Sequence, residues 1–82
     1  MDETIRFNVE EINEEYTLKI LKEIKEILEE KGYNSINQIV GYLMSGDPGY
    51  ITSYKDARKK IMSIDRSRAL EVLIKKALIW DI

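Results

Sequence analysis

Apolar side chains recur at intervals of three and four residues between Glu14 and Lys31. An α-helix places residues at this spacing on one face, and the Glu and Lys residues between them fill the other face. Gly32 follows directly, and glycine commonly ends a helix. The pattern therefore predicts a long amphipathic helix from about Glu14 to Lys31. Its predicted buried stripe consists of Ile20, Leu21, Ile24, Ile27 and Leu28.

A second helix is predicted to begin at Ser35, because Ser35 and Gln38 have the spacing of a capping box. Gly46 is its predicted end, and Asp47-Pro48-Gly49 suits a turn because Pro fixes φ and Gly tolerates positive φ. Gly41 lies in mid-helix, where glycine costs about 1 kcal/mol relative to alanine, so close packing by a neighbour is expected there. The predicted apolar stripe consists of Ile36, Ile39, Val40, Leu43 and Met44.

Two shorter helices are predicted after this turn. Ser53 and Asp56 form a second candidate capping box, and Asp65 is a candidate cap for the last helix. The expected inward residues of the third helix are Tyr54, Ala57, Ile61 and Ile64. Those of the fourth are Leu70, Leu73, Ile74, Ala77 and Leu78. Val72, Ile79 and Trp80 widen this face, which is broader than one thin core needs.

These patterns predict an all-α fold, a small bundle of about four helices, because no segment alternates apolar and polar residues as a strand would. Residues 1–12 show no comparable helical period and are predicted to be a flexible regulatory tail. Residues 13–82 are predicted to form one helical domain. A chain of 82 residues buries only about 60% of its unfolded surface, so self-association would compensate for a thin core.

The composition argues against several classes of function. The chain has no cysteine and no histidine, which removes disulfides, thiolate metal sites and the usual nucleophile–base pairs. No apolar run approaches the roughly 20 residues that span a bilayer, and the acidic start shows no signal-peptide pattern. We therefore expect a cytoplasmic protein that is not an enzyme, does not insert into a membrane, and has no catalytic residue, metal or cofactor.

Charge is unevenly distributed along the chain. Residues 1–51 carry 5 Lys or Arg against 11 Asp or Glu, whereas residues 52–82 carry 8 against 4. Two short helices joined by a glycine-containing turn, with cations between Lys55 and Lys60, leave a nucleic-acid-binding helix–turn–helix as the alternative interpretation. Of the side chains that commonly contact base edges, this region offers only Arg58. A solvated face or another anion is therefore favoured over nucleic acid.

Thr4 lies in the acidic segment DETIRFN, between two acids and an Ile-Arg-Phe triplet. Phosphorylation there would add about −1.5 to −2 charges and three acceptor oxygens. Arginine binds phosphate well, and the basic half supplies Arg58, Arg66 and Arg68. An ordinary tail hydroxyl is the simpler interpretation of Thr4, and an electrostatic switch is the functional one.

The segment EKGYNSINQIVGYLMSGDPGYITSYKDAR, Glu30 to Arg58, together with DETIRFN, Asp2 to Asn8, resembles the IreB family of small regulatory phosphoproteins from Gram-positive bacteria. The longer segment covers about a third of the chain. The chain departs from the family pattern in three places. Ser35 replaces a proline, Ile51-Thr52-Ser53 lacks an arginine, and the sequence after Arg58 is more basic.

The resemblance implies a homodimer without enzymatic activity, regulated by a Ser/Thr protein kinase that senses the cell wall and by a partner phosphatase. It also implies a role in cell-envelope stress, β-lactam tolerance and peptidoglycan precursor synthesis, with a protease-adaptor target in that synthesis. Thr4 matches the family's phosphoacceptor. The predicted basic surface for a phosphate or a partner consists of Lys55, Arg58, Lys59, Arg66 and Arg68.

Two ways for a phosphate on Thr4 to act remain open at this point. It could dock on the basic surface and mask it from a partner, or it could order the tail into a new binding face. A purely structural dimerisation module is a third, simpler class of function.

Overall fold

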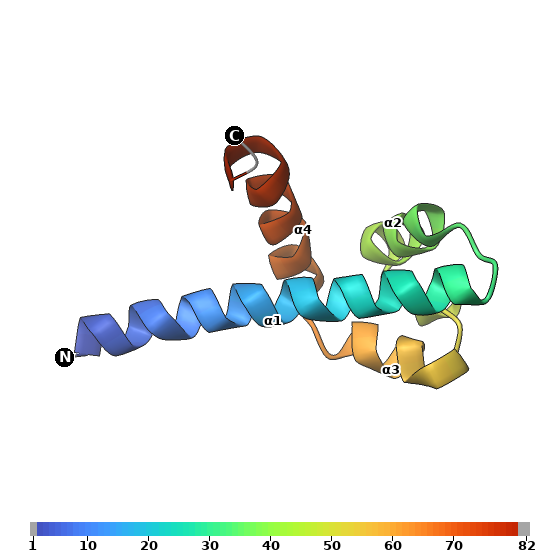
Figure 1. Cartoon of the computed structure of the whole chain (residues 1–82), viewed down its shortest axis with the longest axis horizontal. Helices are drawn as coiled ribbons and strands as arrows, with labels where there is room; N and C mark the ends of the chain where they lie inside the picture. Colours follow the sequence, from blue (N-terminus) through green and yellow to red (C-terminus); the bar gives the residue numbers. More distant parts are fainter. Residues whose placement is uncertain (1, 81–82) are drawn as a thin grey trace.

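A computed structural model describes residues 2–80 of the chain, with side chains described for residues 13–79. This part of the chain is all-helical and contains four α-helices, which confirms the predicted fold class. Figure 1 shows α2, α3 and α4 gathered along the C-terminal part of α1, whose N-terminal part extends beyond them. The elements are α1 (Asp2–Glu30), α2 (Ser35–Ser45), η1 (Pro48–Tyr50), η2 (Tyr54–Asp56), α3 (Ala57–Met62), α4 (Arg66–Lys75) and η3 (Lys76–Trp80).

The predicted stripe of α1 forms the centre of the core, and all five of its apolar side chains are buried. The start of this helix differs from the expectation, because α1 begins at Asp2 rather than near Glu14. Apolar periodicity marks only the part of a helix that packs. The first turn carries Asp2 and Glu3, and acids are favourable at the positive end of a helix dipole. The predicted flexibility of the tail stays a prediction.

Ser35 was predicted to be the N-cap of α2, but the N-cap in the structure is Asn34. The Asn34 side chain accepts a hydrogen bond from the N–H of Asn37 at 3.1 Å. Ser35 is the first helical residue, and its buried hydroxyl donates to the Glu29 carboxylate at 2.8 Å. Gly46 ends the helix as predicted, with a left-handed φ of 75°.

Gly41 admits a close neighbour, as predicted. The neighbour is the ring of Tyr50 in η1, and a Cβ atom at position 41 would stand 2.5 Å from its Cε1 atom and 3.0 Å from Cγ. The turn before η1 is held by Asp47, whose carboxylate accepts from the N–H of Gly49 at 2.8 Å. The chain after α2 therefore folds back against the helix it has just left.

The predicted capping box at Ser53 and Asp56 does not form, since neither side chain accepts a capping hydrogen bond. The Thr52 hydroxyl instead accepts from the N–H of Tyr54 at 3.2 Å. Lys55 and Asp56 take left-handed conformations, with φ of 51° and 62°, so the chain bends sharply before α3. The predicted inward residues are confirmed: Ala57, Ile61 and Ile64 are buried, and Tyr54 is partly buried.

Asp65 caps α4 as predicted, because its carboxylate accepts from the N–H of Ser67 at 3.0 Å. The predicted inward face of α4 is wrong for its main stripe, although Val72, which was predicted to widen that face, is buried. The buried residues of α4 are the small Ala69 and Val72, which have no exposed surface. Small side chains let this face lie close to its neighbours, so the broader apolar stripe is turned outward. The exposed residues of that stripe are Leu70, Leu73, Ile74, Ala77 and Leu78.

Candidate functional site

Arg58 is attached to the backbone of the segment that follows α2. Its Nε–H points at the carbonyl oxygens of Ile51, at 2.8 Å, and Pro48, at 3.1 Å. These two carbonyls lie at the end and the start of the η1 turn. A guanidinium suits this position because its planar donors have a fixed direction. Arg58, predicted as part of a basic surface, therefore also fixes the path of the chain between α2 and α3.

Arg66 contacts the same part of the chain from α4. Its Nη1 donates to the carbonyl of Leu43 at 3.2 Å, which is one of the carbonyls that the end of α2 leaves without a helical partner. The guanidinium passes so close to Gly46 that a Cβ atom there would stand 2.7 Å from Cζ. The structure thus brings Arg58 and Arg66 to one segment, residues 43–51, where both bind backbone carbonyls.

Lys55 belongs to a different cluster, at the C-terminal end of α1. Its ammonium donates to the Glu30 carboxylate at 3.0 Å, and the Tyr54 hydroxyl donates to the same carboxylate at 2.7 Å. Lys31 lies over the Tyr54 ring, 4.8 Å from its centroid. These contacts tie the sharp bend at Lys55 to the end of α1.

The pKa values of this cluster are shifted by its hydrogen bonds. The Tyr54 hydroxyl, and then Lys55, hold the pKa of Glu30 below its ordinary value of 4.5. The hydrogen bond to Glu30 raises the pKa of Tyr54 above 10.0 and that of Lys55 above 10.5. All three pKa shifts favour the states present at neutral pH, which are the ionised Glu30, the neutral Tyr54 and the charged Lys55.

The five cations of the predicted basic surface are therefore in different environments. Lys59 is exposed and forms no ion pair among the described side chains. Arg68 is half-buried on α4, near Asn13 and Thr17 of α1. The neighbouring Lys60 lies 3.6 Å from Glu23. Cations that hold the turns together favour a structural use of this region over the nucleic-acid alternative.

The backbone of Thr4 lies in α1, but its side chain lies outside the residues whose side chains the structure describes. Along an α-helix, the 26 positions between Thr4 and Glu30 span roughly 39 Å. Glu30 contacts Lys55, so Thr4 and Lys55 lie at opposite ends of α1. The continuous helix of Figure 1 separates them within one chain.

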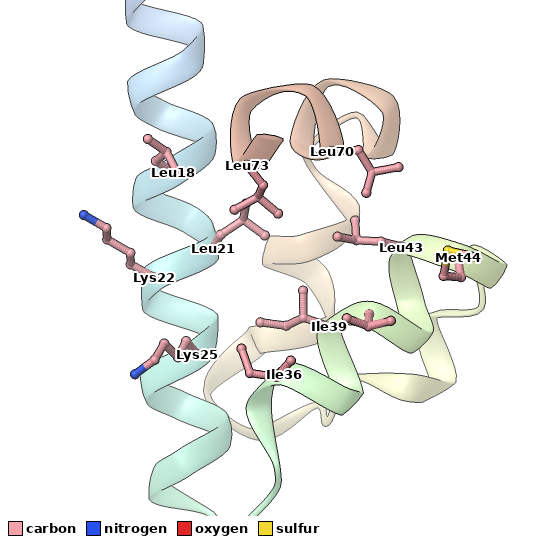
Figure 2. A pocket seen from close by; sticks show the side chains of 11 residues that line it. Leu18, Leu21, Lys22, Lys25, Ile36, Ile39, Leu43, Met44, Leu70 and Leu73 are labelled. Carbon is pink, nitrogen blue, oxygen red and sulfur yellow. The ribbon is translucent and has the colours of Figure 1, made fainter. Parts of the chain in front are cut away.

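An apolar groove of about 330 Å³ lies between α1, α2 and α4. In Figure 2, apolar side chains of all three helices converge on it, whereas the ammonium groups of Lys22 and Lys25 point away. The lining includes Leu18 and Leu21 of α1, Ile39 and Leu43 of α2, and Leu70 and Leu73 of α4.

The predicted stripe of α2 only partly enters the core, because several of its residues border this groove. Met44, Ile36 and Val40 are 76%, 62% and 50% exposed. The sequence predicted only that these three residues share one apolar face of the helix. The signal that could have identified a surface was the surplus of apolar residues over what one thin core needs. Contiguous exposed apolar side chains on a small domain usually mark a contact surface.

α4 is held against α1 by an ion pair. Lys75 Nζ donates to the Glu14 carboxylate at 3.0 Å, and the Glu14 side chain is only 13% exposed. The hydrogen bond to Glu14 raises the pKa of Lys75 above 10.5. Lys75 also lies 3.6 Å from Glu71, one turn earlier on α4. The pair fixes the end of α4 that carries the exposed apolar stripe.

Within residues 13–79, no three carboxylates gather as they would around a metal ion. α1 has 29 residues, but neither it nor another helix of the described chain is apolar enough over a sufficient length to cross a bilayer. The apolar groove and the cations around the η1 turn are two features of the described residues that are suited to binding.

The chain was compared with models of known protein families. The family described as IreB regulatory phosphoprotein matches residues 2–79 of the chain. The match extends well beyond the motif between Glu30 and Arg58, and it includes the segment around Thr4 and all of α4. More than half of the chain is therefore covered.

Proposed function

Because this chain belongs to the IreB family of regulatory phosphoproteins, we propose that it is itself a non-enzymatic regulator, switched by phosphorylation of Thr4. The family is one of regulators rather than enzymes. The observation that carries the proposal is the extent of the match, which begins at residue 2 and so includes the DETIRFN segment. Thr4 is the threonine of that segment.

The proposed setting is the control of the cell envelope from the cytoplasm. A cell-wall-sensing Ser/Thr protein kinase adds the phosphate, and a partner phosphatase removes it. The output is a change in the cell-envelope stress response, in β-lactam tolerance and in peptidoglycan precursor synthesis, through a protease-adaptor target. A phosphate changes the charge of the acidic segment strongly enough to alter such a contact.

We further propose that the working form is a homodimer. The groove between α1, α2 and α4 supports this, because its borders expose large apolar side chains of two helices. A pairing of two copies through this face would bury side chains such as Met44, Leu73 and Ile74. A twofold dimer uses the same patch on both copies, and an apolar patch is complementary to itself.

We also propose that the basic residues act as two groups. Arg58, Arg66 and Lys55 position the turns, since each already binds a carbonyl or a carboxylate. Lys59 and Arg68 have no such partner in the described structure. The half-buried Arg68, beside polar side chains of α1, is available for a phosphate, and the exposed Lys59 is available for a protein partner. The predicted basic surface is thereby divided between holding the fold and binding.

The first test is phosphorylation by the cognate kinase, followed by mapping of the modified residue by mass spectrometry. The expected result is one phosphate on the wild-type protein that is absent from Thr4→Ala. Thr52→Ala is the matched control and should be modified like the wild type. Unchanged modification of Thr4→Ala would exclude Thr4 as the switch.

A further inference from the structure

A second pocket, of about 340 Å³, lies where α1 passes the link between α3 and α4. Its character is the opposite of that of the apolar groove, because most of its lining side chains are polar. They are Asn13, Tyr16 and Thr17 of α1, Ser63 and Asp65 of the link, and Arg68 of α4. Three separate elements therefore contribute polar groups to one cavity.

Arg68 is the unexplained member of this pocket. Its side chain is half-buried, yet it makes no ion pair or hydrogen bond with any residue that the structure describes. Other cations that contact α1 are paired: Lys75 with Glu14, Lys60 with Glu23 and Lys55 with Glu30. A guanidinium has five N–H donors and is bound best by a planar or tetrahedral oxyanion. The Arg68 guanidinium thus lies in this pocket without an ion-pair partner among the described side chains.

The other side chains of the lining suit an anion with several oxygens. The Tyr16 hydroxyl and the Asn13 amide are donors that make no hydrogen bond within residues 13–79. Asp65 is the acid among the lining residues, and its carboxylate accepts from the N–H of Ser67 at the start of α4. The positive end of the α4 dipole offsets the charge of that carboxylate. Asp65 is therefore engaged at the start of α4, and it forms no ion pair with Arg68.

We propose that this pocket binds a phosphothreonine, and that the phosphothreonine is that of Thr4 in a second copy of the chain. This inference rests on the proposed phosphorylation of Thr4. A phosphate has three free oxygens, enough for the fork of Arg68 and for the hydroxyl or amide donors on α1. A carboxylate has only two oxygens and about half the charge of a phosphate. It is therefore expected to bind in the same pocket more weakly.

The second copy is required by the geometry of α1. Asn13, which lines the pocket, lies nine positions after Thr4 on the same helix. Nine positions along an α-helix span about 13.5 Å, which is farther than a phosphorylated threonine side chain reaches. The N-terminal part of α1 extends away from the other helices in Figure 1, so it is placed to contact another molecule. The phosphate therefore acts between copies of the chain.

A synthetic peptide tests this without the kinase. The peptide spans residues 2–10 and carries phosphothreonine at Thr4, and it is titrated into the unmodified full-length protein by calorimetry and NMR. The expected result is saturable binding, with shifts at Tyr16 and Ser63. The unphosphorylated peptide should bind at least about tenfold more weakly, because it lacks the dianion. Equal binding of both peptides would overturn the proposal.

Two variants assign the binding to Arg68. Arg68→Gln should weaken phosphopeptide binding by about tenfold or more, whereas Lys59→Gln, which removes another unpaired cation, should leave it within about twofold. Arg68→Lys keeps the positive charge but loses the forked guanidinium donors. Its affinity for the phosphopeptide should therefore lie between those of Arg68→Gln and Lys59→Gln. Equal losses of phosphopeptide affinity in Arg68→Gln and Lys59→Gln would show that the peptide is held by general charge attraction. That result would overturn the proposed site at Arg68. Tm values of the variants show whether each is folded.

Inorganic phosphate is the last arm of the experiment. Phosphate that shifts the same NMR signals and competes with the peptide supports a phosphate site at Arg68. Peptide binding that phosphate does not reduce would place the contact elsewhere and contradict the proposal. The peptide is synthesised with its phosphate in place. Its failure to bind would therefore not contradict the proposal that a kinase phosphorylates Thr4. The two proposals can therefore fail separately.

Discussion

The ring of Tyr50 lies against the backbone of Gly41, so close that a Cβ atom at position 41 would stand 2.5 Å from Cε1 of the ring. This contact fixes η1 on the back of α2, next to the carbonyls that Arg58 binds. The glycine, which is unfavourable for the helix by itself, is explained by this neighbour.

We expect Gly41→Ala to lower the free energy of unfolding by about 1–3 kcal/mol, because the new methyl group overlaps the ring. In a Tyr50→Ala background the overlap is gone. There, Gly41→Ala should instead stabilise the protein by about 0.5–1 kcal/mol through its better helix propensity. Urea unfolding of the four proteins of this double-mutant cycle measures the coupling. The same effect of Gly41→Ala in both backgrounds would contradict the contact.

Arg58→Ala should destabilise the fold, because it removes the Nε–H that contacts the Pro48 and Ile51 carbonyls. We expect a loss of about 1.5–3 kcal/mol in the free energy of unfolding, typical of a hydrogen bond made by a charged group. The neighbouring cation Lys59 makes no such bond, and Lys59→Ala should change stability by less than about 0.5 kcal/mol. Urea unfolding compares the two, and equal values would show that Arg58 has no structural role.

The Glu30 cluster predicts a stability that falls at both extremes of pH. The pKa of Glu30 is lowered, so its contribution is present above 4.5 and is lost as the pH falls through the shifted value. The pKa values of Tyr54 and Lys55 are raised. Their contributions are therefore present at neutral pH and are lost as the pH rises through the shifted values.

Glu30→Gln should weaken both limbs of this pH dependence, since one carboxylate is the partner of Tyr54 and of Lys55. The measurement is the Tm followed from about pH 3 to about pH 11. Glu26→Gln is the control, because Glu26 is exposed on the same helix and forms no ion pair among the described side chains. Parallel curves for the wild type and Glu30→Gln would rule out a contribution from the cluster.

The apolar groove predicts the oligomeric state. We expect the wild-type protein to sediment as a dimer and Met44→Glu as a monomer, because Met44 is 76% exposed at the groove and a buried charge there would be unpaired. Met62 is also exposed, at 55%, but lies on α3 away from the groove. Met62→Glu should remain dimeric. A wild-type monomer, or dimers of both variants, would refute this interface.

Much of the local structure could be predicted from short stretches of the sequence. The stripe of α1, the end of α2 at Gly46 and the cap at Asp65 depend on a few neighbouring positions, and all were confirmed. The bend at Lys55 and Asp56 could not be predicted, because two left-handed non-glycine residues have no local signature. They are held there by the pairing of Lys55 with Glu30, 25 residues away.

The sequence by itself determined that this chain is helical and that each helix has an apolar face, because helical periodicity and capping are local properties. Only the tertiary structure decided which of those faces meet. The core takes Ala69 and Val72 of α4 and leaves Leu73 and Ile74 outside. Small side chains allow the helices to approach, and a hydrophobic pattern does not distinguish a neighbouring helix from a second molecule.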